Sequence, residues 1–133
     1  MAIVGERIRE ISGRKQKSEQ IKGLRMNIGI DDVRVNEKNL EIDYSYTANY
    51  DEGVGNLTIK GTILAVEDAA LAKKIADEWK KNKKLPQEYT TVVLSAINYS
   101  GSANGTLLAR VLNLAAPFIP PRIELSKPSS PSK

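Results

Sequence analysis

The clearest pattern in the chain is a strict alternation of apolar and polar residues from Leu40 to Tyr50. A period of two, carried by β-branched and aromatic residues over this length, predicts a half-buried strand. A second alternation, from Leu57 to Ala65, predicts the next strand. The glycine-containing stretch 51–55 between them is typical of a hairpin connection. The apolar face of the first strand carries Leu40, Ile42, Tyr44, Tyr46, Ala48 and Tyr50.

A less regular strand precedes these two. Apolar residues alternate on one parity from Leu24 to Ile30, and Val33 and Val35 continue on the other parity. The slip of phase at residues 31–32 predicts a bulge or a bend, because one extra residue reverses which face each later side chain occupies. Three strands are therefore expected in order along the chain. A fourth would come from this split segment or from an edge strand at residues 123–125.

Helical spacing begins after Asp68. Ala72, Ile75 and Trp79 recur at the helical period, and the lysines that follow suit the negative end of the helix dipole. Pro86 opens a second apolar stripe that continues to Leu114. Gly101 and Gly105 either divide this region into two helices or let another backbone approach, and we favour one long helix over residues 87–113. The predicted fold class is α+β, an antiparallel β-meander of three to four strands packed against two C-terminal helices.

The two ends of the chain differ from its middle. Residues 1–23 are basic, and Ile8 and Ile11 give them a weak helical face, so they are expected to be a partly helical or flexible leader. Residues 24–125 are expected to form a single domain, since the 133-residue chain suits one core of ordinary size. Residues 126–133 contain only Ser, Pro and Lys and are expected to be a disordered tail.

Composition argues against catalysis. The chain has no histidine and no cysteine, which removes the usual general base, the commonest metal ligand, disulfides and thiol nucleophiles. Gly53 and Gly55 are followed by a predicted strand, whereas a dinucleotide loop requires a helix there. The acidic residues lack the spacing of a calcium loop. We therefore expect no enzyme and no cofactor. Without a signal peptide or a long apolar run, a cytoplasmic protein with no membrane span is expected.

Two surfaces are candidates for binding. The first holds Tyr44, Tyr46 and Tyr50, with Trp79 of the predicted helix, which would either line a groove for extended polypeptide or pack in the core. A sheet covered on one side also leaves an edge that favours a partner, so a homo-oligomer is expected.

The second candidate surface is basic. The net charge of +4 permits nucleic acid as a partner without requiring it. The lysines after Trp79 either neutralise the end of their own helix or join the leader as a phosphate-binding surface for ribosomal RNA or ribosomal proteins. The residues of this surface are Arg7, Arg9, Arg14, Lys15, Lys17, Lys80, Lys81, Lys83 and Lys84.

The order of elements resembles a known family. Three strands in a meander, two helices and then a Leu-Asn-Leu stretch with prolines (residues 112–117) look like the SecB-like export-chaperone fold and the small archaeal proteins grouped with it. The resemblance covers roughly residues 24–125. It implies a sheet with helices on one side, assembly through strand edges and helices, and binding of unfolded polypeptide without nucleotide or catalytic residue. Two features depart from the family pattern: this chain is basic, and only three strands are clear.

Overall fold

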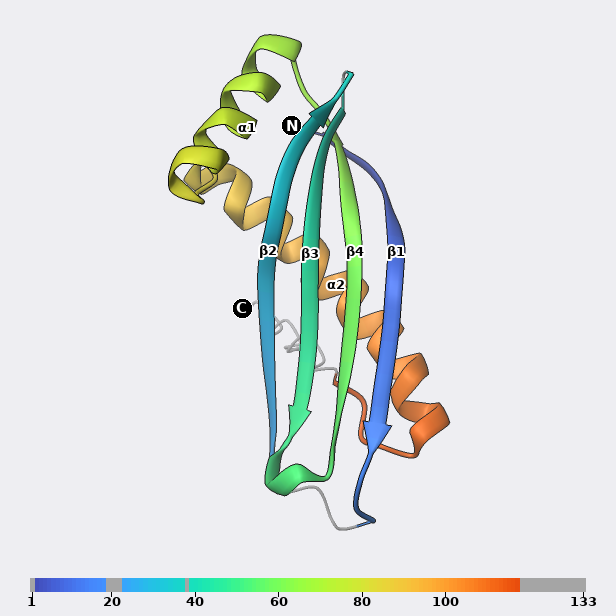
Figure 1. The fold of residues 1–133 in the computed structure, drawn as a ribbon. Helices are drawn as coiled ribbons and strands as arrows, with labels where there is room; N and C mark the ends of the chain where they lie inside the picture. Colours follow the sequence, from blue (N-terminus) through green and yellow to red (C-terminus); the bar gives the residue numbers. More distant parts are fainter. Residues whose placement is uncertain (1, 19–22, 38, 118–133) are drawn as a thin grey trace, which may run out of the picture.

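A computed structural model describes residues 2–18, 23–37 and 39–117 of the chain. Four strands come first, with a short 3-10 turn before the last of them, and two helices follow (Figure 1). The elements are β1 (Ala2–Lys15), β2 (Leu24–Asn36), β3 (Asn39–Tyr50), η1 (Asp51–Gly53), β4 (Gly55–Val66), α1 (Ala69–Asn82) and α2 (Gln87–Leu112).

The strands form one antiparallel sheet in the order β1-β4-β3-β2, and both helices lie on one face of it (Figure 1). β2, β3 and β4 make the predicted meander, and β1 pairs with β4 at the far edge. The predicted α+β class, with two helices after the sheet, is confirmed. The fourth strand comes from the N-terminal segment, whereas residues 123–125 lie outside the described residues, as does the predicted tail.

The expectation of a partly helical or flexible leader is wrong for residues 2–15, which form β1. The register of β1 against β4 shifts between Ile3 and Gly5 and again between Ile8 and Glu10. Ile8 lies opposite Gly61 and Ile11 lies opposite Ile59, two positions of one parity. The extra residue of the bulge therefore places two isoleucines three positions apart on the same face of the sheet. That spacing imitates a helical face in the sequence.

The predicted slip in β2 is confirmed as a bulge. Ile30 lies opposite Tyr44 while Asp32 lies opposite Asp43, so Asp31 has no partner of its own in β3. After the bulge, Val33 points into the core and only 1% of it is exposed. The bulge thus lets both halves of β2 bury their apolar side chains beneath the helices.

Residues 87–112 form one helix, as favoured, and the two glycines are inside it. A Cβ atom on Gly101 would lie 2.3 Å from the Tyr46 ring, and one on Gly105 would lie 2.8 Å from Cγ of Pro117. Both distances are far below a van der Waals contact. The glycines therefore serve the close approach of α2 to β3 and to the segment that follows α2.

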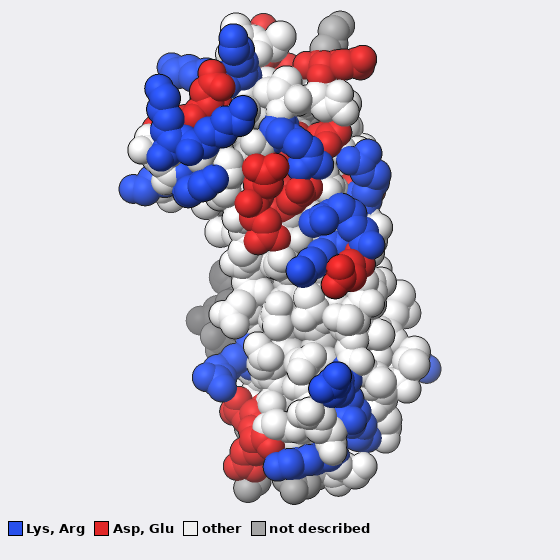
Figure 2. Space-filling model, in the orientation of Figure 1, with Lys and Arg blue, Asp and Glu red and all other residues white. Residues whose placement is uncertain are grey.

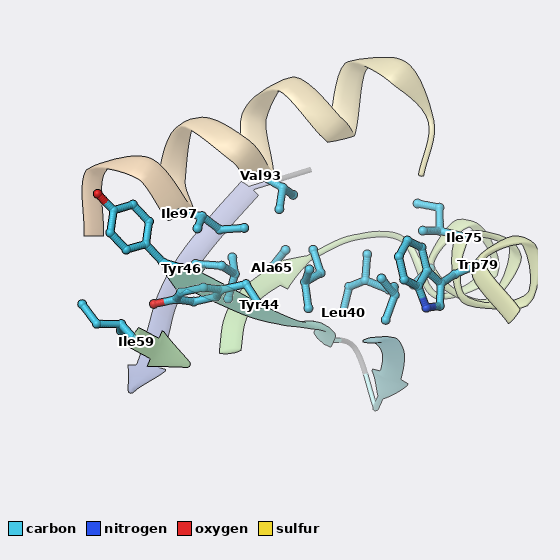
Figure 3. Packing of buried hydrophobic residues seen from close by; sticks show 13 residues of the cluster. Leu40, Tyr44, Tyr46, Ile59, Ala65, Ile75, Trp79, Val93 and Ile97 are labelled. Carbon is cyan, nitrogen blue, oxygen red and sulfur yellow. The ribbon is translucent and has the colours of Figure 1, made fainter. Parts of the chain in front are cut away.

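The core lies between the sheet and the helices (Figure 3). The predicted apolar face of β3 is buried along its whole length, and α1 contributes Ala72, Ile75 and Trp79. The Asp68 side chain accepts a hydrogen bond from the Leu71 N–H at 3.3 Å and so caps the start of α1. α2 crosses the sheet from the β2 side to the β1 side (Figure 1). At its far end, a Cβ on Gly13 of β1 would lie 2.8 Å from Leu112.

Candidate functional site

A groove lies where the end of α1, the start of α2 and the edge strand β2 meet. Its volume is about 540 Å³, within the range of roughly 300–1,000 Å³ that ligand pockets occupy. β2 supplies two side chains of its helix-facing parity, α1 supplies one aromatic ring, and the connection between the helices supplies two lysines. The lining residues are Ile28, Ile30, Trp79, Lys83, Lys84, Leu85, Gln87, Thr90 and Leu94.

The groove combines an apolar floor with a cationic side. Ile28, Ile30 and Leu85 are partly buried, and Leu94 is 37% exposed. Because β2 is an edge strand, its outer backbone N–H and C=O groups have no ladder partner among the described residues. An apolar floor beside an open strand edge is the arrangement that accepts an extended polypeptide, which can pair with the edge and place alternate side chains in the groove.

Trp79 and Lys83 contact each other at the groove. The indole is 6% exposed, and its N–H has no acceptor within the described part of the chain. The Lys83 ammonium lies 5.8 Å from the centre of the indole ring, within the range of a cation–π contact. Lys83 is also the C-cap of α1 and has a left-handed backbone with φ of 55°, where its N–H donates to the Trp79 carbonyl at 2.8 Å.

The three tyrosines of the predicted surface are buried, and they lie apart from Trp79. Tyr44 and Tyr46 have no exposed area and Tyr50 has 3%, so these three lie in the core, and Trp79 alone of the four predicted residues lines the groove. Burial raises the pKa of Tyr44 to about 12. Its hydroxyl donates to Glu6 of β1 at 2.8 Å. The tyrosine hydroxyls thus hold neighbouring segments against the sheet.

The hydroxyls of Tyr46 and Tyr50 bind the segment after α2. Tyr46 donates to the Pro117 carbonyl at 3.1 Å, and Tyr50 donates to the carbonyl of Ala115. These bonds draw the Leu-Asn-Leu stretch and its proline back across β3, where Leu114 is buried.

The predicted basic surface is not one continuous patch. Arg7 and Arg9 lie on the uncovered face of the sheet and pair with Glu41 at 3.5 Å and with Asp43 at 4.0 Å. At the other end of β1, Lys15 donates to the Asn113 carbonyl at 3.4 Å. Arg14 and Lys17 lie near that same end, since Arg14 is opposite Asn56 and Lys17 donates to the Glu52 carbonyl.

The lysines at positions 80, 81, 83 and 84 belong to the helix side of the molecule, at the end of α1. The sheet therefore separates them from the arginines of β1. Figure 2 shows basic side chains gathered over α1, and a mixture of acidic and basic side chains on the neighbouring strands. The structure gives the RNA-binding interpretation no support, because the phosphate-binding surface it requires is interrupted by carboxylates.

Arg34 is the centre of the charged network on the uncovered face. It lies 2.6 Å from Asp43 and 2.9 Å from Glu41, and hydrogen bonding to Asp43 raises the pKa of Arg34. A hydrogen bond from Asn36, together with Arg34 and Arg7, holds the pKa of Glu41 below its usual value. Burial alone would raise the pKa of Asp43, but hydrogen bonds from Arg34 and Thr62 lower it overall. The network links all four strands.

Sequence reasoning missed most of the groove. Ile28 and Ile30 were recognised as strand residues, but nothing in their alternation distinguishes a residue at an open edge from a central one. The other apolar and polar lining residues come from the connection between the helices and from the start of α2: Leu85, Gln87, Thr90 and Leu94. They line the groove because the end of α1 and the start of α2 meet there. The available signal was the Leu-Pro break between two amphipathic helices.

The fold is that of SecB-like chaperones. A solved structure, the Mycobacterium tuberculosis Rv1957 SecB-like chaperone in complex with a ChAD peptide from the Rv1956 HigA1 antitoxin, superposes with a TM-score of 0.57. The match covers 92% of this chain and 91% of the other at 10% sequence identity. No model of a protein family matches the chain, and neither does any curated protein. The comparison provides no support for a particular likeness to archaeal proteins.

Two further observations concern what the described residues lack. Neither described helix is both long and apolar enough to cross a membrane. No cluster of acidic side chains within residues 2–18, 23–37 and 39–117 is suited to hold a metal ion.

Proposed function

We propose that this protein is a non-catalytic, chaperone-type module that binds unfolded or extended polypeptide in the groove beside β2. The observation that carries the proposal is a groove of about 540 Å³ with an apolar floor, which lies along an edge strand. Apolar side chains of a client would occupy the floor, and its backbone would pair with β2, which makes the binding tolerant of sequence. The shared fold with a SecB-like chaperone that holds a peptide supports this assignment.

Binding can be measured through the single tryptophan of the chain, which lies in the groove. An extended, Trp-free peptide with alternating leucines is expected to change Trp79 fluorescence saturably and to delay aggregation of an unfolded client. Leu94→Asp should abolish both effects, because it places a carboxylate in the floor that an apolar client side chain would cover.

Leu71→Asp is the matched control. Leu71 is 38% exposed, close to the 37% of Leu94, but it lies in the first turn of α1 outside the groove. It should bind peptide like the unmodified protein. If both variants bind equally well, the groove is not the binding site. If the unmodified protein neither binds peptide nor protects a client, the chaperone proposal is wrong.

We also propose that the protein works as a homo-oligomer. The outer side of α2 carries exposed apolar side chains at one-turn and two-turn spacings, which a monomer would leave in water: Val92, Tyr99, Leu107 and Val111. Exposed apolar stripes of this kind mark interaction surfaces. The double variant Tyr99→Ser and Leu107→Ser should reduce the molar mass measured by light scattering at unchanged helix content. A monomeric unmodified protein would contradict this proposal.

A further inference from the structure

The charge at the groove is entirely of one sign. Lys83 and Lys84 line it, and no carboxylate is among its lining residues. Within the described part of the chain, neither lysine makes an ion pair, in contrast to Arg7, Arg9 and Arg34 on the opposite face of the sheet. Two ammonium groups thus border an apolar floor with their charge uncompensated by a neighbouring carboxylate.

The backbone conformation of Lys83 and its contact with Trp79 fix where this charge lies. Its φ of 55° belongs to the left-handed region, which at the C-terminus of a helix is normally occupied by glycine or asparagine. A side chain with a Cβ is disfavoured there. Here the helix end and the Trp79 ring hold the Lys83 ammonium beside the groove.

The two parts of the groove impose different requirements on a bound segment. The floor of Ile28, Ile30 and Leu94 accepts apolar side chains of many shapes, and pairing with β2 accepts any backbone. Neither contact discriminates between clients by charge. The lysines do, because an acidic side chain next to the apolar anchor gains an ion pair, whereas a basic one meets repulsion.

We propose that the groove selects polypeptide segments in which apolar residues are flanked by Asp or Glu, with the carboxylates paired to Lys83 and Lys84. This inference rests on the proposed function, since it concerns what the same groove prefers. At low salt an acidic peptide should bind roughly tenfold more tightly than a basic peptide with the same apolar core, because each partly exposed pair contributes modestly. The preference should shrink as salt rises.

The test uses three Trp-free peptides with one leucine-rich core flanked by Glu, Gln or Lys, each titrated against Trp79 fluorescence in the full-length protein. The expected order of affinity is Glu, then Gln, then Lys. The double variant Lys83→Gln and Lys84→Gln should bind all three peptides with nearly equal affinity.

The matched control is Lys73→Gln with Lys74→Gln. These residues are exposed on α1 and do not line the groove, and the loss of net charge is the same. This variant should keep the order of affinities. Equal binding of the three peptides by the unmodified protein would overturn the selectivity while leaving the proposed function intact. A preference weakened equally in both double variants would also overturn it, since that result assigns the effect to overall charge. Absence of binding by any peptide would instead contradict the proposed function.

Discussion

The two edge strands of the sheet occupy equivalent places but are stabilised differently. β2, with 13 residues, packs four partly buried apolar side chains and the buried Val33 against the core. β1, with 14 residues, leaves Ile8 and Ile11 38% and 49% exposed and buries none of its side chains fully. Backbone pairing runs from Ala2 to Lys15, and the ion pairs of Arg7 and Arg9 add to it.

Both edge strands are paired through their backbones and take part in the charged network, but only β2 adds side-chain burial to these contacts. Only burial leaves a regular hydrophobic period in the sequence. The difference also has a functional side. The edge with buried side chains is the one that borders the groove, whereas the edge held by backbone pairing closes the β4 side of the sheet.

The largest effect is expected from removing β1. Deleting residues 1–15 uncovers the edge of β4 and removes the pairing partners of residues from Gly55 to Val66. We therefore expect the protein to lose most of its free energy of folding, which is roughly 5–15 kcal/mol for an ordinary domain. Circular dichroism during thermal unfolding should show no cooperative transition. Deleting residues 126–133 is the control. A normal transition without residues 1–15 would mean that β1 is dispensable, as a flexible leader would be.

A smaller effect is expected from breaking the charged network that joins β1 to β2. Arg34→Ala leaves Glu41, which is 5% exposed, and Asp43 without their shared partner. Exposed ion pairs contribute up to about 1 kcal/mol and buried ones cost about 3–5 kcal/mol when broken, so this half-buried case should cost about 1–2 kcal/mol.

Arg25→Ala is the matched control for Arg34→Ala. Arg25 is on the same strand, but its side chain is 81% exposed in its pair with Asp51, so its removal should cost less than about 0.5 kcal/mol. Chemical denaturation measures both costs. Equal costs for the two variants would mean that the network contributes no more than an ordinary surface pair.

A third experiment compares the same substitution on the two edges. Ile28→Thr on β2 removes apolar area that packs against the core and should cost about 1 kcal/mol, while Ile11→Thr on β1 should cost less than about 0.5 kcal/mol because its side chain is half exposed. Only Ile28→Thr should also weaken peptide binding. The comparison fails if Ile11→Thr has the greater cost in denaturant unfolding.

The smallest effect is expected in the acid dependence of stability. The pKa values of Glu41 and Asp43 are lower in the folded protein than the ordinary 4.5 and 3.8, so the unfolded chain binds more protons in this range. Stability from these groups is therefore present above those values and is lost as the pH falls through the folded pKa values.

The measurement is the free energy of unfolding at about pH 6 and about pH 3, in the unmodified protein and in Arg34→Ala. The unmodified protein should lose more stability on acidification than the variant, because the variant no longer lowers these pKa values as far. An identical loss of unfolding free energy in both proteins would mean that Arg34 does not cause the acid dependence of stability.

Most of the fold could be predicted because β2, β3, β4 and the two helices each carry a visible period. β1 could not, since its two register shifts disturb the period and its pairing partner is β4, whose paired residues lie 40 to 64 positions later in the chain. The lining of the candidate groove is a separate case. Trp79 lies in the groove, but Tyr44 and Tyr46 lie beneath α2, because Gly101 lets that helix approach their strand closely. The ion pairs of Arg7 and Arg9 with β3 could not be predicted either, because their partners are distant in the sequence.

The pairing of β1 with β4 also constrains the order of events during synthesis. Ala2 pairs with Val66, so the first strand to leave the ribosome has to wait until the fourth has been made. Contacts this distant in sequence form slowly, because a long loop must close before they give any stabilisation. Before β4 exists, the charged side chains of Glu6, Arg7, Arg9 and Glu10 favour exposure of this segment to water. The same charges that make β1 resemble a leader in the sequence thus keep it hydrated until β4 is available for pairing.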